Sequence, residues 1–276
     1  MHGLGNDFVV LDCISHNISV QPALVKAMAD RHFGIGCDQL LVVDAPLTPD
    51  ADFSYRIFNA DGNEVEQCGN GARCFAKYVS DKRLTEKKSI QVDTVSGRIV
   101  LNIEADQQIT VDMGAPNFSP SSLPLAVEEQ QDRYRTELDG QPLNFWAVSM
   151  GNPHAIITVD DIKTAPVSTT GPALQNSALF PKSVNVGFLE IDNECFVHLR
   201  VYERGVGETL ACGTGACAAV VAGIANGYLS SPVTVNLSSG SLVIRWDSEQ
   251  DNVFMTGPAN TVFTGQYQWR PAQTNQ

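Results

Sequence analysis

The 276-residue sequence lacks several features that would assign it to common classes of protein. It has no apolar run long enough to span a bilayer, so we do not expect a membrane protein. It has only 18 Lys and Arg against 31 Asp and Glu, which gives a formal net charge of −13. Because binding to nucleic acid requires cations that neutralise phosphates, we do not expect a nucleic acid as a partner.

Its first residues, Met1-His2-Gly3-Leu4-Gly5-Asn6-Asp7, lack the charged and apolar regions of a signal peptide. We therefore expect a cytoplasmic protein whose cysteines are reduced. The cysteines number seven, and an odd count disfavours a complete disulfide framework. The composition, with 43% hydrophobic and 18% charged residues, is typical of a globular protein.

Common cysteine and glycine motifs are also missing. No Gly-Lys-Ser/Thr follows the Gly-x-Gly phrases, so they are not phosphate-binding loops. No C-x-x-C pair is present, which argues against a thiol–disulfide exchanger. The intervals from Cys68 to Cys74 and from Cys212 to Cys217 exceed the usual spacing of zinc ligands, so zinc is the weaker interpretation. No lysine-containing phrase indicates pyridoxal phosphate.

The sequence does contain one short phrase twice. Cys68 begins C-G-N-G-A-R-C, and Cys212 begins C-G-T-G-A-C, 212 − 68 = 144 positions later. Each phrase leads into an apolar run typical of a helix. A thiol at a helix start lies beside unpaired N–H groups and the positive end of the helix dipole. Such surroundings lower a thiol pKa, so the phrases predict two activated cysteines.

Four further echoes follow in the same order along the chain. They pair Gly5-Asn6 with Gly151-Asn152, Pro22-Ala23-Leu24 with Pro172-Ala173-Leu174, Ser96-Gly97 with Ser239-Gly240, and Met113-Gly114-Ala115-Pro116 with Met255-Thr256-Gly257-Pro258. Each Pro-Ala-Leu phrase is predicted to begin a helix, with proline in its first turn. Collinear echoes indicate duplication. We expect homologous halves at residues 1–112 and 113–257, and a tail, 258–276, that either frays or completes the first half.

Short β-branched segments dominate each half and predict strands. In the first half these are Asp38–Asp44, Ser89–Val95, Ile99–Ile103 and Ile109–Met113. Helical periodicity marks Leu24, Val25, Met28 and Ala29, and again Cys74, Phe75, Tyr78 and Val79. Ala216–Ala225 is apolar on all faces, which predicts a buried helix. We predict an α+β fold in which each half is a curved, mostly antiparallel sheet or barrel around a central helix, with the active site in the cleft between the halves.

Two equivalent acid/base groups on opposite walls of a cleft can invert a stereogenic carbon. One, as thiolate, removes a proton, and the other, as thiol, delivers one to the opposite face. Removing a proton next to a carboxylate builds negative charge, which N–H donors at two helix starts would stabilise. Glycines at Gly69, Gly71, Gly213 and Gly215 permit close backbone approach there.

Further phrases carry a resemblance to a known family. They are Met1-His2-Gly3-Leu4-Gly5-Asn6-Asp7-Phe8, Gly36-Cys37-Asp38-Gln39, Phe58-Asn59-Ala60-Asp61-Gly62, Gly151-Asn152-Pro153-His154, Asn185-Val186 and Tyr202-Glu203-Arg204-Gly205. With both cysteine phrases, the sequence resembles the diaminopimelate epimerase family nearly end to end. The resemblance implies cofactor-independent epimerisation of LL-2,6-diaminoheptanedioate to the meso isomer, in lysine and peptidoglycan precursor biosynthesis. It also implies a homodimer and no catalytic metal.

The resemblance further implies roles for individual residues. Cys68 and Cys212 would be the two acid/base residues, and His154 and Glu203 would tune their pKa values. The substrate pocket would comprise Asn6, Gln39, Asn59, Gly69, Asn70, Asn152, Asn185, Glu203, Arg204, Gly213 and Thr214. The guanidinium of Arg204 is a natural fork for a distal carboxylate.

Two departures from the family pattern are visible. Family members usually carry several residues before the first phrase, so either the true start lies upstream or the first strand is shorter. Phe263 stands where some members have a tyrosine associated with dimer contacts, so dimer formation through this residue is expected without the hydroxyl.

Several alternatives stay open on sequence alone. Asn59 can be a turn former, His154 a structural histidine at a strand edge, and Glu203 with Arg204 a surface ion pair. The whole chain can be another cofactor-independent racemase of the proline-racemase kind, or a non-catalytic redox or metal-binding protein.

Overall fold

The computed structural model describes residues 1–65, 68–138 and 140–269, and the chain forms two compact units. Unit 1 comprises Met1–Val111 with Gly257–Gln276, and unit 2 comprises Asp112–Thr256. The limits expected from the sequence, 1–112 and 113–257, differ from these by one residue at each boundary. Of the tail expected to complete the first half, residues 270–276 lie outside the described residues.

The described part of unit 1 contains eight strands and two helices. They are β1 (His2–Gly3), β2 (Asn6–Asp12), α1 (Pro22–Ala29), β3 (Gln39–Asp44), β4 (Phe53–Asn59), β5 (Glu64–Val65), α2 (Gly69–Asp81), β6 (Ser89–Thr94), β7 (Gly97–Ile103) and β8 (Ile109–Asp112). The pairs β2–β3 and β4–β6 are parallel. The pairs β1–β2, β3–β4, β4–β5, β6–β7 and β7–β8 are antiparallel. The four strands predicted in this half are confirmed as β3, β6, β7 and β8, each within two residues at its ends.

Unit 2, in the residues that the structure describes, repeats this pattern and adds one strand. Its elements are the short 3-10 helix Pro120–Ser122, β9 (Tyr134–Leu138), β10 (Gln141–Ser149), β11 (Pro153–Thr158), α3 (Val167–Gln175), β12 (Asn185–Asn193), β13 (Phe196–Glu203), β14 (Gly207–Thr209), α4 (Gly213–Ala225), β15 (Val233–Leu237), β16 (Gly240–Arg245) and β17 (Phe254–Gly257). The pairs β11–β12 and β13–β15 are parallel. Each of β10–β11, β12–β13, β13–β14, β15–β16 and β16–β17 is antiparallel.

The order and sense of pairing are therefore the same in both units once β10 is matched to β1 and β17 to β8. Helix α3 takes the place of α1, and α4 takes the place of α2. The predicted α+β class, in two sheet-rich parts that each hold a helix, is confirmed. The sequence did not predict the parallel pairs, because each joins strands that are separated by a helix.

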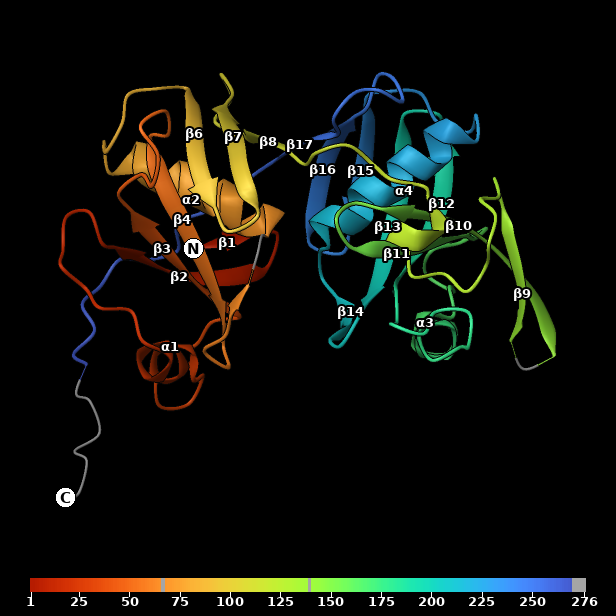
Figure 1. Cartoon of the computed structure of the whole chain (residues 1–276), viewed down its shortest axis with the longest axis horizontal. Helices are drawn as coiled ribbons and strands as arrows, with labels where there is room; N and C mark the ends of the chain where they lie inside the picture. Colours follow the sequence, from red (N-terminus) through yellow and green to blue (C-terminus); the bar gives the residue numbers. More distant parts are fainter. Residues whose placement is uncertain (66–67, 139, 270–276) are drawn as a thin grey trace. The chain divides into compact units, whose positions relative to one another are not determined.

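The two helices of unit 1 pack on opposite faces of β3 and β4. Leu24 and Met28 of α1 pack with Leu40, Val42 and Phe58. Side chains alternate between the faces of a strand. The intervening residues of β3 and β4 therefore face the other way, and there they meet α2, since a Cβ on Gly71 would lie 3.1 Å from a Leu41 methyl carbon. Figure 1 shows α2 against the strands of unit 1, with α1 apart from it.

Helix α4 is the buried helix of unit 2. Residues 215–223 are all buried, so the helix is apolar on every side as the sequence predicted. It packs against β10, β11, β12, β13, β15 and β16, which accounts for that burial. Figure 1 shows these strands around it. A helix enclosed in this way holds its first residue, Gly213, and the preceding Cys212 in a fixed position.

The predicted start of a helix at Pro172 is wrong. Helix α3 begins at Val167, and Pro172 is its sixth residue. A proline inside a helix removes one backbone hydrogen bond and costs about 3 kcal/mol. Val167 and Leu174 both belong to the buried core of unit 2, and their burial offsets that cost. By contrast, Pro22 is the first residue of α1, as predicted.

Candidate functional site

In unit 1 the candidate residues are the first or last residues of three strands, beside the start of α2. Asn6 begins β2, Gln39 begins β3, and Asn59 ends β4. Gln39 is paired with Phe8 of β2 and with Asn59 of β4, so all three ends share one edge of the sheet. Gln39 Nε2 donates a hydrogen bond to Asn59 Oδ1 at 2.9 Å. The backbone of Asn59 also begins a turn, since its carbonyl accepts from Gly62 N–H.

Cys68 is the N-cap residue of α2 and has an extended backbone, with φ −141° and ψ 115°. Its carbonyl accepts the first helical hydrogen bond, from Ala72 N–H, at 2.8 Å. The same carbonyl accepts from the buried Tyr55 hydroxyl at 3.4 Å. Gly71 leaves room for this hydroxyl, because a Cβ there would lie 2.8 Å from it. These contacts hold the backbone of Cys68, whose side chain is half-buried.

The Asn6 amide connects Cys68 to a charged cluster. Cys68 Sγ lies 3.5 Å from Asn6 Oδ1, and Asn70 Nδ2 donates to the same oxygen at 3.3 Å. Asn6 Nδ2 donates to Asp38 Oδ2 at 3.0 Å. Asp38 is held in turn by Arg31, at 2.7 Å. Sequence reasoning missed the role of Asp38, although the phrase Gly36-Cys37-Asp38-Gln39 contains it.

Unit 2 presents the equivalent edge. Asn152 precedes β11, Asn185 begins β12, and Glu203 ends β13. His154 of β11 is paired with Asn185, as Phe8 is with Gln39 in unit 1. The Asn185 side chain accepts from Arg204 N–H at 2.9 Å and donates to the Pro153 carbonyl at 3.1 Å. The structure thus brings the predicted residues of each half together at one sheet edge.

Cys212 is the N-cap residue of α4, again with an extended backbone. Its side chain is 4% exposed, and Thr214 Oγ1 lies 3.6 Å from its sulfur. Burial and then the neighbouring Glu203 carboxylate raise the pKa of Cys212 well above its ordinary value. The expectation of a lowered pKa at Cys212 is therefore wrong. The helix start does favour the thiolate, but loss of water and a nearby anion outweigh it.

His154 lies inside the sheet of unit 2, since β11 pairs with both β10 and β12. The strand-edge interpretation is therefore wrong. Its ring is fully buried, and Nε2 lies 3.0 Å from Asn152 Oδ1. Asn152 Nδ2 donates to Thr214 Oγ1 at 3.3 Å, which leaves its oxygen to accept from the histidine N–H. Nδ1 is then a buried acceptor without a hydrogen-bond partner among the described residues.

Burial lowers the pKa of His154 to about 3, and the positive charge of Arg204 adds to this effect. His154 is therefore neutral at physiological pH. A neutral imidazole with its proton on Nε2 orients the Asn152 amide towards Thr214 and the Cys212 loop.

Glu203 and Arg204 have separate partners. Glu203 Oε1 accepts from Thr209 Oγ1 at 2.5 Å, and Arg204 donates to the Lys182 carbonyl at 3.3 Å. These partners differ from the surface ion pair left open by the sequence. Sequence reasoning missed Thr209, which β14 brings against the end of β13.

The remaining candidates are placed simply. Gly69 and Gly213 are the first residues of α2 and α4, and Asn70 and Thr214 follow them. Phe263 lies in the C-terminal segment of unit 1 and is 65% exposed.

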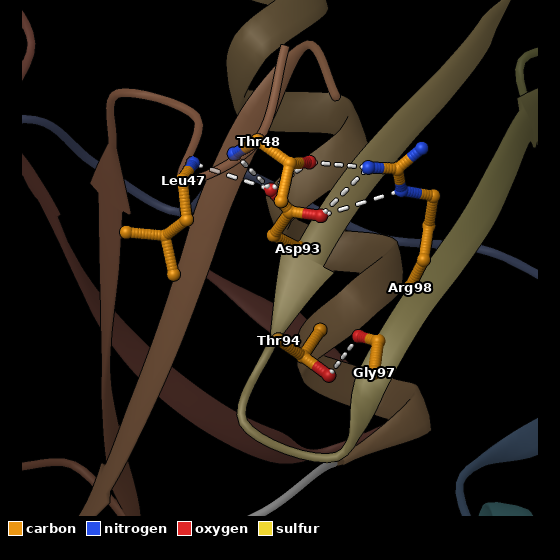
Figure 2. A pocket seen from close by; sticks show the side chains of 6 residues that line it. All are labelled: Leu47, Thr48, Asp93, Thr94, Gly97 and Arg98. Carbon is orange, nitrogen blue, oxygen red and sulfur yellow. Dashed lines mark hydrogen bonds and ion pairs between the residues drawn. The ribbon is translucent and has the colours of Figure 1, made fainter. Parts of the chain in front are cut away.

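A pocket of about 440 Å³ in unit 1 contains none of these candidates. Figure 2 shows that its polar groups bind one another. Asp93 accepts from Leu47 N–H at 3.2 Å and from Thr48 N–H at 2.9 Å, and it pairs with Arg98 at 3.2 Å. These bonds attach the loop at Leu47 and Thr48 to the β6–β7 hairpin. Because the polar groups of this pocket bind one another, we do not assign the functional site to the pocket.

Three further observations concern metal-binding groups, the state of the cysteines and membrane-spanning helices. Within residues 1–65, 68–138 and 140–269, no group of three His, Cys, Asp or Glu side chains could hold a metal ion. All seven cysteines lie in these ranges, and each is a free thiol. No helix in the described part of the chain has both the length and the apolar character needed to cross a membrane.

Solved structures share the fold. A phenazine biosynthesis protein of the PhzF family from Bacillus anthracis superposes with a TM-score of 0.64 at 17% identity, covering 93% of this chain and 91% of that one. A hydroxyproline epimerase from Agrobacterium vitis superposes with a TM-score of 0.60 at 13% identity, covering 93% and 87%. The chain therefore has the two-domain α+β fold of these proteins.

Sequence comparison is more specific. The family model described as diaminopimelate epimerase matches residues 1–119 and 146–262. Diaminopimelate epimerases from Pseudomonas savastanoi and Pseudomonas aeruginosa are each 56% identical over 266 residues, covering 96% of this chain and 96% of theirs. The chain belongs to the diaminopimelate epimerase family.

Proposed function

We propose that the protein epimerises LL-diaminopimelate to the meso isomer without a cofactor, with Cys68 and Cys212 as its two acid/base residues. Family membership supports the substrate. The matched positions of the two cysteines, each the N-cap of the second α-helix of its unit, support the mechanism and carry the proposal.

The reaction removes one proton from the α-carbon of the substrate and adds another proton to the same carbon. The thiolate of one cysteine takes the α-proton, and the electron pair of the broken C–H bond passes into the carboxylate-stabilised carbanion. The thiol of the other cysteine protonates the opposite face of that carbon. The raised pKa of Cys212 keeps it protonated at neutral pH, so it is the acid when Cys68 is the base.

The helix starts would stabilise the charge that develops on the substrate carboxylate. The first-turn N–H groups of a helix have no helical partner and carry partial positive charge. Gly69 and Asn70 in unit 1, and Gly213 and Thr214 in unit 2, supply such donors next to each cysteine. Donors already in place at developing charge are among the largest contributions to catalysis.

The polar side chains at the two sheet edges would hold the rest of the substrate. Amides bind ammonium and carboxylate groups without adding charge, and we assign this role to Asn6, Gln39, Asn59, Asn152 and Asn185. Arg204 would bind the distal carboxylate, because its guanidinium has five donors and its bond to the Lys182 carbonyl uses only part of them. Glu203 would accept from a substrate ammonium group.

His154 and Glu203 would also set the proton affinities of the site. Glu203 opposes ionisation of Cys212 through its negative charge. Buried His154 stays neutral and fixes the Asn152–Thr214 hydrogen bond beside the same thiol. Both ionisable side chains belong to unit 2, so the proposed tuning acts first on Cys212.

Assembly and location belong to the same proposal. Val262 and Phe263 expose neighbouring apolar side chains, at 66% and 65%, and we propose that they contribute to a homodimer contact. A Phe263→Glu variant should then run as a monomer in light scattering. We also propose a cytoplasmic enzyme of lysine and peptidoglycan precursor synthesis, because the mechanism requires reduced thiols.

The direct test is to incubate the reduced protein with LL-diaminopimelate and resolve the stereoisomers by chiral chromatography. We expect the meso isomer to form, and we expect Cys68→Ala and Cys212→Ala to abolish its formation. L-Proline serves as the alternative substrate, and a faster change of configuration in proline would favour a proline-racemase-like activity. No inversion of diaminopimelate by the wild-type protein would overturn the proposal.

A further inference from the structure

Arg73 is a fully buried cation in helix α2. Burying a guanidinium is costly unless its donors are well matched, so its partners indicate its role. Nη2 donates to Asn70 Oδ1 at 2.8 Å, and Nε donates to the Pro258 carbonyl at 3.2 Å. The backbone of β1 also makes room for it, because a Cβ on Gly3 would lie 3.2 Å from Nη2.

The guanidinium decides which way the Asn70 amide points. Arginine has donors and no acceptor, so only the amide oxygen of Asn70 can face it. The Asn70 NH₂ group must then point away, and it donates to Asn6 Oδ1 at 3.3 Å.

The Asn6 amide is fixed from both ends as a result. Its NH₂ group donates to the Asp38 carboxylate, which can only accept. Its oxygen faces Asn70 and lies 3.5 Å from Cys68 Sγ. A single buried cation therefore begins a chain of oriented amides that ends at the thiol.

We propose that Arg73 is a positioning residue of the site: it orients Asn70, and through Asn70 it turns the Asn6 oxygen towards the Cys68 sulfur. This inference rests on the proposed function only where it takes Cys68 as an acid/base residue. Arg73 itself bonds Asn70 and Pro258, so it acts through its neighbours.

Unit 2 contains a comparable series of hydrogen bonds that begins at a different kind of side chain. Arg73 is the fifth residue after Cys68, and the fifth residue after Cys212 is Cys217, which cannot take the same role. There the series of hydrogen bonds begins at buried His154 and passes through Asn152 to Thr214. The bond between equivalent positions is also reversed, since Asn70 donates to Asn6 whereas Asn152 donates to Thr214. Each unit thus uses one fully buried side chain to orient the amides at its cysteine.

The competing role for Arg73 is a structural tie between α2 and the Pro258 segment. A double-mutant cycle separates the two roles, because residues that act through one another give non-additive effects. Arg73→Met is made in the wild-type protein and in the Asn70→Ala background. Arg98→Met is the matched control, since it also removes a hydrogen-bonded guanidinium from unit 1 but lies on β7, bonded to Asp93.

The first readout is the rate at which iodoacetamide alkylates Cys68, resolved by mass spectrometry, with Cys212 as the internal reference. The second readout is kcat and KM for epimerisation, and thermal unfolding is followed for every variant. Because alkylation needs no substrate, it tests the role of Arg73 even if diaminopimelate is not turned over.

We expect Arg73→Met to change the Cys68 alkylation rate by about threefold or more, with little change in the Asn70→Ala background. Arg98→Met should leave Cys68 unchanged while lowering the unfolding temperature. Equal effects of Arg73→Met in both backgrounds, or a loss of thermal stability with unchanged Cys68 reactivity, would overturn the proposal.

If Arg73→Met does not fold, Asn70→Asp tests the same chain from its other end. The carboxylate keeps an acceptor for Arg73 and removes the donor to Asn6. Asn70→Asp and Asn70→Ala should both change the Cys68 alkylation rate relative to the wild type, because each removes the donor to Asn6 Oδ1. Asn70→Asp should also retain the thermal stability of the wild type. Unaltered Cys68 reactivity in Asn70→Asp would equally contradict the proposal.

Discussion

Phe8 and His154 occupy the same position in the two units. Phe8 begins the parallel register of β2 with β3, opposite Gln39, and His154 begins that of β11 with β12, opposite Asn185. Both side chains are buried, at 3% and 0% exposure. One unit therefore has a hydrocarbon ring where the other has a titratable one. The two backbones match at this position, but the electrostatic surroundings of Cys68 and Cys212 differ.

The first prediction concerns the acid stability of the fold. The pKa of His154 is about 3 in the folded protein against 6.5 for an ordinary histidine. Between these values the unfolded chain binds the extra proton, so the stabilisation present above pH 6.5 is lost as pH falls towards 3. His154→Phe, which copies Phe8, removes this loss. Between pH 6.5 and 4.5 the wild type should lose about 2 kcal/mol more than the variant in urea unfolding.

Parallel pH dependence of the two proteins would contradict that account. The comparison between wild type and variant matters here, because carboxylates also titrate at the lower end of this range.

The second prediction concerns the thiol of Cys212. Burial is the main cause of its raised pKa, and the Glu203 carboxylate adds to it. Glu203→Gln removes the negative charge and keeps the shape, so the Cys212 pKa should fall and its thiolate fraction at a given pH should rise. Alkylation of Cys212 at pH 8 should become faster, by about threefold or more.

Glu249→Gln is the matched control, since it removes one charge from an exposed position of unit 2. It should leave the alkylation rate of Cys212 unchanged. A rate that is unchanged or slower in Glu203→Gln would show that the carboxylate does not oppose ionisation of this thiol.

The third prediction concerns the packing of α3. Replacing a helical glycine by alanine ordinarily stabilises a protein by about 1 kcal/mol. At Gly171, however, the new Cβ would lie 2.7 Å from Tyr202 Cγ and 2.8 Å from Tyr202 Cβ, atoms close to the backbone rather than at the far end of the side chain. Overpacking of this kind costs about 1–3 kcal/mol, so Gly171→Ala should be destabilised overall in urea unfolding.

Ser168→Ala changes an exposed position of the same helix and should be neutral or slightly stabilising. If Gly171→Ala proves as stable as Ser168→Ala, the close packing of α3 on Tyr202 is not what the structure describes.

The helix starts at both cysteines were predictable because their signals are local. Glycines after Cys68 and Cys212 and the apolar runs behind them lie within one segment each. The parallel pairing of β2 with β3 was not predictable, because it depends on how α1 packs between distant segments. Strand periodicity identifies a strand and leaves its partner open.

The surroundings of individual site residues could be predicted only in part. The sequence placed Cys212 at a helix start, but its raised pKa also depends on complete burial and on Glu203, which β13 brings from elsewhere in the chain. Arg73 gave no signal beyond its place in the cysteine phrase, since its role depends on the direction of one amide. The start of α3 was predicted wrongly at Pro172, because proline in a first turn is a local pattern. The helix begins at Val167, whose burial depends on the packing of the whole unit.

The central claim is that two cysteines act on opposite faces of one carbon, and isotope exchange tests it most directly. Cys68→Ala and Cys212→Ala are each incubated with LL- and meso-diaminopimelate in deuterated water, and both inversion and α-deuteration are followed by NMR. Each variant should lose inversion in both directions. Any exchange that persists should be confined to one stereoisomer, and to a different one in each variant. Wild-type inversion in either variant, or exchange of the same stereoisomer by both, would contradict the two-cysteine mechanism.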